Sequence, residues 1–440
     1  MVQKRTLNAI ETLFAVENVR FALLLVMPVD DEETLNDEIS RLATLARSTR
    51  LGNLLIEREP SMDVDAEETW TLTQELGKYS CKPTGEGLLT NQRHNNELDL
   101  KDYGRILENL VQKDTESAEG GLTVKIGLKE TKDGKRKFLY VNGNHAMVDG
   151  RSLTHFLSVL AGLKKSSLAW KTQTIPNWRN MVMTSTGKME KWSENPPFIE
   201  GENKTLTFRE LSTDTSSSGQ ESFRFCFPVE VLKSVRKVIK ICAPGTTVTG
   251  LLAAATMQSL RAEYKGTESR DIAVSMLVDL RPFIEIMDEI NQAHGTVTLI
   301  YSAEKFKAPP VDFDCFDNFD HVLQAADCLT KQLREKILRG EAHRAALAVT
   351  NGEYEKAGPT ATFELSNLGV CEIPMGAELF TSQRFDGYDG VSCLVHSESP
   401  SEGSFRWNVS VGTGLDSNLV ERVFANAVKI FRHIAKLKRT

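Results

Sequence analysis

The chain has 440 residues, of which 40% are hydrophobic and 26% are charged. These are ordinary values for a globular protein that can bury a sizeable core, and they exclude collagen-like, low-complexity and disulfide-scaffold classes. The 53 Lys and Arg residues against 60 Asp and Glu residues give a formal charge of −7. With no local basic stripe, the sequence does not predict nucleic-acid binding.

The sequence contains no recognisable targeting signal or membrane-spanning segment. Residues 1–7 carry charge but precede no apolar run, so no signal peptide is expected. The longest apolar stretch, residues 21–29, contains Pro28 and is about half of the ~20 residues that a membrane helix needs. The seven cysteines form no C-x-x-C pair and the histidines show no metal-ligand spacing, so we expect free thiols and no metal. We therefore expect a cytoplasmic protein with no membrane span.

The first part of the chain is predicted to mix strands and helices. Asp133-Gly134 lies between two alternating segments and is a strong hairpin signal. Periodicity predicts strands over 21–27, 122–130 and 136–142 and helices over 30–48 and 152–163.

Residues 166–222 differ from the rest of the chain in composition and periodicity. This segment is polar, contains Pro176, Pro196 and Pro197, and has no sustained period, so we interpret it as a crossover between two domains. The expected organisation is an N-terminal domain over 1–165, the crossover, and a C-terminal domain over 223–440.

The second domain is again predicted to be α/β. Helices are expected over 229–241, 248–262, 316–338 and 415–437, and strands over 271–278, 296–302, 362–365 and 405–411. The two domains are similar in size and element type, so a duplicated architecture of mixed sheets is plausible on pattern alone.

The segment that carries chemistry is Asn144-His-Ala-Met-Val-Asp-Gly150, where a predicted strand ends and a helix begins. Loops at strand ends are where α/β folds place reactive groups. A structural interpretation is also open, because Asp149 is a good N-cap, Gly150 is a good turn residue and His145 is an acceptable strand-end residue. The chain has no G-x-S-x-G elbow, G-x-G-x-x-G or P-loop, so a serine hydrolase or a nucleotide cofactor is not expected.

This segment resembles the H-x-x-x-D-G motif of the CoA-dependent acyltransferase superfamily. That superfamily includes chloramphenicol acetyltransferase, plant BAHD acyltransferases, fungal alcohol acetyltransferases, polyketide-associated acyltransferases and condensation domains. Further similar segments follow in the expected order: Arg5-Thr-Leu-Asn-Ala-Ile-Glu11, Val278-Asp-Leu-Arg-Pro-Phe283, His294-Gly-Thr-Val-Thr-Leu299 and Ser366-Asn-Leu-Gly369. Position 144 is Asn where condensation domains have a second His, and the plant D-F-G-W-G is absent. The resemblance is therefore strongest to the alcohol acetyltransferase branch.

The resemblance implies two chloramphenicol-acetyltransferase-like domains that form a pseudo-dimer with a channel between them. It implies that His145 is the general base, that Asp149 pairs with Arg281, and that Gly150 leaves room for the pantetheine arm of CoA. It places Thr296 and Thr298 on a strand that lines the channel. For Ser366 and Asn367, channel or oxyanion contact and a polar strand-end turn remain two open interpretations.

We expect a monomeric enzyme with no permanently bound cofactor that uses acyl-CoA as co-substrate. It would move the acyl group to the hydroxyl of a small hydrophobic or secondary-metabolite alcohol by direct transfer, without an acyl-enzyme. One alternative is a carrier-protein-dependent enzyme that forms an ester or amide by condensation or release. Another alternative is a binding relative without catalysis.

Overall fold

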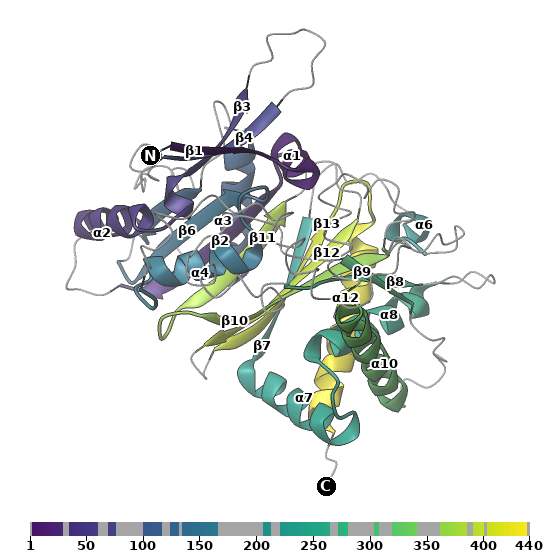
Figure 1. Ribbon diagram of the computed structural model, residues 1–440. Helices are drawn as coiled ribbons and strands as arrows, with labels where there is room; N and C mark the ends of the chain where they lie inside the picture. The colour runs from purple at the N-terminus through teal and green to yellow at the C-terminus, as the bar shows by residue number, and fades with distance from the viewer. Residues whose placement is uncertain are drawn as a thin grey trace.

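The computed structural model describes residues 2–29, 35–59, 69–75, 100–116, 124–131, 134–165, 206–212, 221–264, 272–279, 303–307, 319–340, 361–384, 390–399 and 403–437. Within these ranges the chain forms two halves, each built on its own sheet, and a smaller sheet beside the first half (Figure 1). This is the mixed α/β architecture that the sequence predicts. Residues 166–205 of the expected crossover and the expected strand 296–302 lie outside the described residues.

The first half is built on a four-stranded antiparallel sheet. Its strands have the spatial order β11 (Glu378–Arg384), β2 (Arg20–Pro28), β6 (Arg136–Asn144), β5 (Lys125–Glu130). Residues 20–27 are all buried, because helices cover both faces of the sheet. Alternate side chains from Phe21 to Leu25 pack with helix α4 (Gly150–Leu160), and those from Ala22 to Val26 pack with helix α3 (Leu100–Glu116).

The predicted hairpin is confirmed by the antiparallel pairing of β5 with β6. Gly134 in its turn has φ +68°, a conformation that glycine adopts without strain. The helix predicted over 30–48 is present as α2 (Leu35–Arg47), and residues 30–34 lie outside the described ranges.

A three-stranded sheet of order β1 (Val2–Thr6), β4 (Thr69–Glu75), β3 (Leu54–Glu59) adjoins this half, with helix α1 (Ala9–Val16) and the short 3-10 helix η1 (Leu51–Asn53). Its Arg5-x-Leu-x-x-x-Glu11 segment forms an ion pair. The Arg5 guanidinium donates two hydrogen bonds of 2.7 Å to the buried Glu11 carboxylate, which also accepts from Asn8 N in a capping box. This motif therefore ties β1 to α1.

The second half is built on a six-stranded sheet. Its strands have the spatial order β7 (Glu221–Pro228), β13 (Ser404–Val411), β12 (Val391–Ser399), β10 (Phe363–Glu372), β8 (Ala273–Leu277), β9 (Ala303–Lys307). β10 pairs in parallel with β12 and β8, and the other pairs are antiparallel. β10 is longer than the predicted strand 362–365, because it continues through the Ser366–Gly369 segment.

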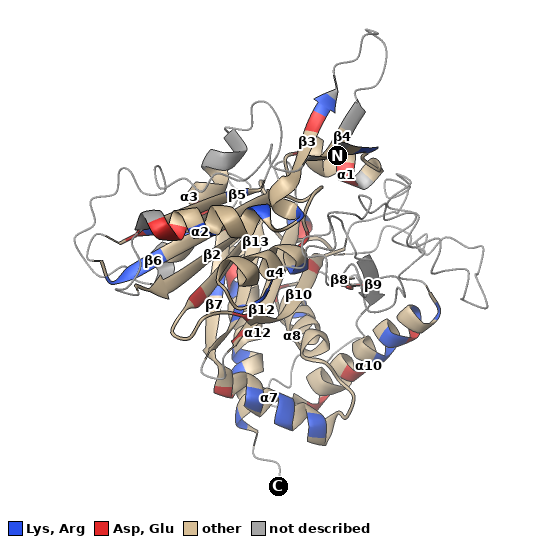
Figure 2. Ribbon diagram, turned by 60° about the vertical axis from the view of Figure 1, so that its left-hand side comes forward, with Lys and Arg blue, Asp and Glu red and all other residues tan. Residues whose placement is uncertain are grey.

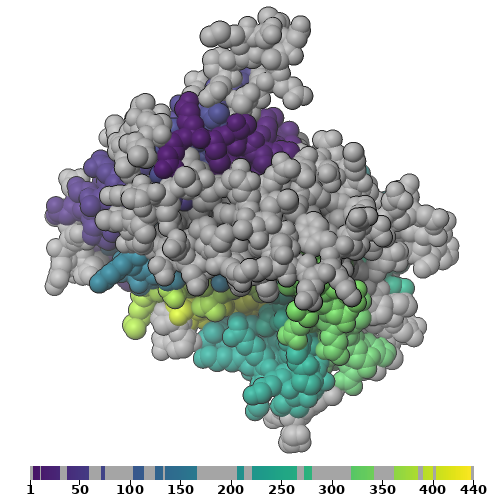
Figure 3. Space-filling model, in the orientation of Figure 1, coloured from purple at the N-terminus to yellow at the C-terminus, as the bar shows by residue number. Residues whose placement is uncertain are grey.

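Four helices cover one face of this sheet: α7 (Val229–Cys242), α8 (Val248–Glu263), α10 (Phe319–Leu338) and α12 (Ser417–Lys436) (Figure 1). All four lie where the sequence predicts helices. Residues 250–260 of α8 are all buried because α10 and α12 flank it against the sheet. In Figure 3, α7 and α10 (teal and green) lie at the lower end of the molecule and α1 (purple) at the upper end. A short helix, α6 (Phe208–Leu211), adds Phe208 to the same core.

The second half of the sequence contributes β11 to the first sheet, where it pairs with β2. A polar cluster connects β11 to the second sheet. Arg406 Nη2 donates to Glu378 Oε2 (2.9 Å), and Arg406 Nε donates to Glu398 Oε1 (2.6 Å). Glu398 Oε1 also accepts from Leu379 N, so β11 of the first sheet is bonded directly to β12 and β13 of the second.

None of the described helices is long and apolar enough to cross a membrane.

Candidate active site

The turn that carries His145 begins where β6 ends, and its backbone is held by hydrogen bonds. His145 N donates to Val19 O (2.7 Å). The Asn144 side chain donates to Phe14 O (3.1 Å) and accepts from Ala146 N (2.9 Å). Asn144, which stands where condensation domains have a second His, therefore anchors the turn to α1.

The His145 ring is enclosed by aromatic side chains. It stacks on Phe14 with ring centroids 4.8 Å apart, and Phe21 approaches edge-on at 6.3 Å. The residue is only 6% exposed, and Nδ1 meets no partner of ordinary hydrogen-bond geometry among the described residues. Burial lowers the pKa of His145 below its usual value near 6.5, because a low-dielectric environment disfavours the imidazolium. The carbonyls of His145 and Val148 and the charge of Asp149 act in the opposite direction and are outweighed.

Asp149 is the N-cap of α4 and accepts a 2.7 Å hydrogen bond from Ser152 N. Its charge also favours protonation of His145. Arg281, its expected partner, lies outside the described residues, as do Thr296 and Thr298. The pairing of Asp149 with Arg281 therefore stays a prediction.

Gly150 brings the motif into close contact with the second half. A Cβ atom at this position would lie 2.5 Å from Leu368 Cδ2 and 2.9 Å from Phe21 Cζ. The space beside Gly150 is thus taken by Leu368 and Phe21. A side chain at position 150 would therefore require Leu368 and Phe21 to shift where α4 begins against β10.

Arg151, which directly follows the His145 motif, contacts two other segments that resemble motifs of the acyltransferase superfamily. Its Nη1 donates to Leu368 O (3.1 Å), and its Nε lies 3.2 Å from Asp279 Oδ2. It therefore links the start of α4 to the Ser366–Gly369 segment and to the segment that contains Arg281. Sequence reasoning missed Arg151, because nothing in its neighbourhood distinguishes it from an exposed residue in the first turn of a helix.

Ser366 and Asn367 lie on β10 where it passes the motif. Asn367 Oδ1 accepts from Gly369 N (2.8 Å) and its Nδ2 donates to Thr249 Oγ1 (2.8 Å). The pairing register of β10 shifts between Asn367 and Gly369, and Gly369 has φ +75°. Asn367 therefore stabilises a bulge and joins it to the start of α8, whereas Ser366 is half-buried.

An open cavity of about 520 Å³ lies beside Asn367 at the N-terminus of α8. Arg236 and Lys240 contribute positive charge from α7, and the first backbone N–H groups of α8 contribute the positive end of the helix dipole. Thr247 satisfies only one of these groups, Gly250 N (3.0 Å). The cavity is lined by Arg236, Ile239, Lys240, Gly245, Thr246, Thr247, Val248, Thr249 and Asn367. It is therefore suited to an anion, and sequence reasoning missed it because Asn367 of β10 reaches the start of α8 only through the fold.

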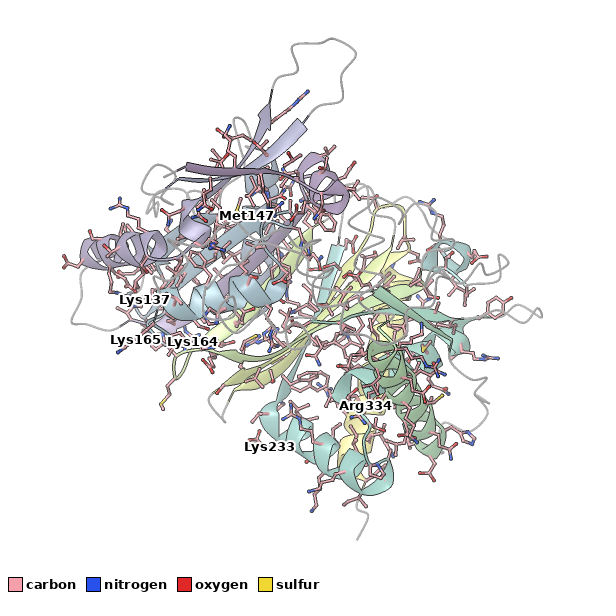
Figure 4. All side chains as sticks on the ribbon, in the orientation of Figure 1. Lys137, Met147, Lys164, Lys165, Lys233 and Arg334 are labelled. Atoms are coloured by element: carbon pink, nitrogen blue, oxygen red, sulfur yellow. The ribbon has the colours of Figure 1, made fainter. Side chains whose placement is uncertain are left out.

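Basic residues also lie outside the cavity, on α7 and α10. Figure 2 shows Lys and Arg gathered along α7. Lys233 and Arg334 lie on α7 and α10 at the opposite end of the view from Met147, which marks the His145 turn (Figure 4). No group of three or more possible metal ligands occurs within the described part of the chain.

Comparison with known proteins adds evidence on the fold. No family model and no curated protein matches the sequence. Among solved structures, the chain is similar to the TRI3 trichothecene 15-O-acetyltransferase from Fusarium sporotrichioides, with a TM-score of 0.64 and 12% identity over 98% of this chain and 96% of that one.

Two further structures have the same arrangement. Polyketide synthase associated protein 5 from Mycobacterium tuberculosis has a TM-score of 0.58 at 14% identity, over 99% of this chain and 98% of that one. The first condensation domain of the CDA synthetase has a TM-score of 0.57 at 12% identity, with the same coverage. The chain therefore has the two-domain fold shared by acyltransferases and condensation domains, as the motifs predict.

Proposed function

We propose that this protein transfers an acyl group from acyl-CoA to the hydroxyl of a small hydrophobic or secondary-metabolite alcohol, with His145 as general base. The observation that carries the proposal is the buried His145 ring. It is held on a rigid turn next to the contact between Gly150 and Leu368, where the two halves meet. Folds of this kind in acetyltransferases and condensation domains support acyl transfer as the class of reaction.

The proposed step needs one proton carrier. Neutral His145 accepts the proton of the acceptor hydroxyl as its oxygen attacks the thioester carbonyl. The C–S bond of the tetrahedral intermediate then breaks, and the imidazolium returns the proton to the departing CoA thiolate. Such base catalysis supplies roughly 10²–10⁴-fold in rate, and the rest comes from positioning the two substrates and stabilising the oxyanion.

An acyl-enzyme on Cys371 is disfavoured, in agreement with direct transfer. Cys371 follows the Ser366–Gly369 segment on the same strand, but burial raises the pKa of its thiol to about 12. It therefore carries almost no thiolate, the nucleophilic form, near neutral pH.

The cavity at the start of α8 supports acyl-CoA as the donor. Its Arg236 and Lys240 side chains and the first N–H groups of α8 match phosphate oxygens in charge and hydrogen bonding. Asn367 lines this cavity and belongs to the strand that touches Gly150. A phosphate group bound there and a thioester at His145 would therefore be held by adjoining segments of the fold.

The test is release of CoA thiol from a panel of acyl-CoA donors with alcohol acceptors, by the wild type and by His145→Ala. We expect acceptor-dependent thiol release that His145→Ala abolishes. Wild-type turnover in the variant would refute the role of His145.

A carrier-protein-dependent enzyme is the second candidate, because condensation domains and a polyketide synthase associated protein share the fold. The same acyl group presented on CoA and on an acyl carrier protein separates the two candidates. A large preference in kcat/KM for the carrier-bound donor would favour the second. No turnover and no binding with any donor would favour a non-catalytic relative.

A further inference from the structure

The face of the second sheet that the four helices leave uncovered carries a row of polar side chains. In β10, Phe363 and Leu365 point into the core beneath the helices, so Glu364 points to the opposite face. The cross-strand partners of Glu364 are Ser275 on β8 and Ser392 on β12. Ser392 pairs in turn with Ser410 on β13, which pairs with Ser222 on β7. One carboxylate and four hydroxyls thus stand in register across five strands.

Three serines of the row, Ser275, Ser392 and Ser410, are buried, whereas Glu364 and Ser222 are half-buried. Ser275 and Ser410 are 7% and 8% exposed, and neither hydroxyl makes a hydrogen bond within the described ranges. Ser392 Oγ donates to Glu364 Oε1 (3.2 Å). Among the described residues, no cation pairs with Glu364. A half-buried carboxylate with no cation beside it, next to hydroxyls that make no protein hydrogen bond, is able to bind a polar group of a ligand.

The row faces the first half of the molecule. At one end, Ser222 Oγ hydrogen-bonds Glu108 of α3, which also pairs with Arg224 (2.6 Å). Two residues further along β13, Asn408 Nδ2 donates to Thr381 Oγ1 of β11 (2.6 Å). Helix α3 and strand β11 of the first half therefore cover the part of this sheet face that β7 and β13 form.

The row also has a defined position relative to His145. Glu364 precedes Leu368, the residue that touches Gly150, by four positions on the same strand. At about 3.3 Å per residue this is roughly 13 Å along β10. An elongated molecule can therefore extend from the contact between Gly150 and Leu368 to Glu364.

We infer that Glu364, with Ser275, Ser392 and Ser410, binds a second hydrogen-bond donor group, hydroxyl or amine, on the acceptor alcohol, far from the hydroxyl that is acylated. This inference rests on the proposed function, because it identifies the acceptor class for the same reaction. The acceptor is then bifunctional, and Glu364 determines specificity without taking part in proton transfer.

The experiment compares three series of acceptors of eight, ten and twelve carbons: alkan-1-ols, α,ω-diols and ω-amino alcohols. We expect the wild type to prefer the bifunctional acceptors by roughly 10- to 100-fold in kcat/KM, the range of a hydrogen bond to a charged group. Glu364→Gln should lose most of this preference, above all for the amino alcohols. Glu372→Gln is the control, because Glu372 lies on the same strand, is exposed and pairs with Lys164.

Binding of 12-aminododecan-1-ol, measured by calorimetry without any donor, separates this inference from the proposed function. If Glu364→Gln binds this amino alcohol more weakly than the wild type does, the acceptor site is supported. If the wild type also turns over no acyl-CoA, the proposed acyl-CoA reaction is refuted while the acceptor site still stands. An unchanged preference in Glu364→Gln, or no binding to the wild type, would overturn the inference. If Glu364→Gln fails to fold, Ser275→Ala and Ser410→Ala take its place, and each should weaken binding several-fold.

Discussion

Gly150 lies so close to Leu368 that a Cβ atom on residue 150 would come within 2.5 Å of Leu368 Cδ2. Gly150 ends the His145 motif in the first half, and Leu368 belongs to β10 in the second. The motif and the strand that passes it are therefore in direct contact, and Arg151 reinforces this contact through its hydrogen bond to Leu368 O.

Gly150→Ala should destabilise the protein by about 1–3 kcal/mol, because the added methyl group overpacks this contact. Leu368→Ala makes room, so the double variant should be more stable than the sum of the two single changes predicts. Urea unfolding of all four proteins measures this coupling. Strict additivity would show that the contact is not the cause.

His145→Gln should reduce turnover by about 10²–10⁴-fold, since the amide cannot accept the acceptor's proton. The control is His433→Gln, because His433 also stacks on a phenylalanine, Phe319, but lies on the exposed side of α12. His433→Gln should keep wild-type turnover. Equal losses in the two variants would argue against a specific role for His145.

The acid limb of the pH profile of kcat/KM should have its midpoint below pH 6.5. Burial lowers the pKa of His145, so the ring stays neutral, and able to act as a base, at pH values where a free imidazole is protonated. Thiol release measured from pH 4.5 to pH 8 tests this. A midpoint at or above 6.5 would mean that burial does not dominate the environment of His145.

Reversing the charge of Arg236 or Lys240 should raise the KM for acyl-CoA by about 10-fold, with a smaller effect on kcat. Both side chains line the cavity at the start of α8, whereas Lys233 on the same helix does not, so Lys233→Glu is the matched control. The difference should shrink as salt is added. An equal change in KM for all three variants would indicate a general effect of net charge.

Arg406→Met should destabilise the protein by about 3–5 kcal/mol, because it leaves Glu398 and Glu378 without their buried partner. Arg136→Met removes a second partner of Glu378, but Arg136 is 44% exposed, so its loss should cost about 0–1 kcal/mol. Chemical denaturation distinguishes the two. Similar values for both would mean that the polar cluster does not hold the halves together.

Much of the fold follows from local pattern. The apolar run of β2, the Asp133-Gly134 hairpin and the helices at 229–242, 248–263 and 417–436 are all recognisable from spacing. These signals are local, because side-chain alternation and turn conformation depend on near neighbours in the chain. β11 and β12 have no comparable signal, and the sequence analysis predicted neither.

Some residues of the candidate site can likewise be found from local sequence, and others only from the tertiary structure. The sequence alone identified His145, Asp149 and Gly150, because one short segment carries them between a strand and a helix. Only the tertiary structure brought Leu368 and Arg151 to that segment, added β11 to the first sheet, and placed Arg236 beside the start of α8. It also aligned Glu364 with serines from four other strands. The physical reason is that strand register and interface contacts join residues from separate elements, more than two hundred positions apart for Gly150 and Leu368, and no local pattern encodes such pairs.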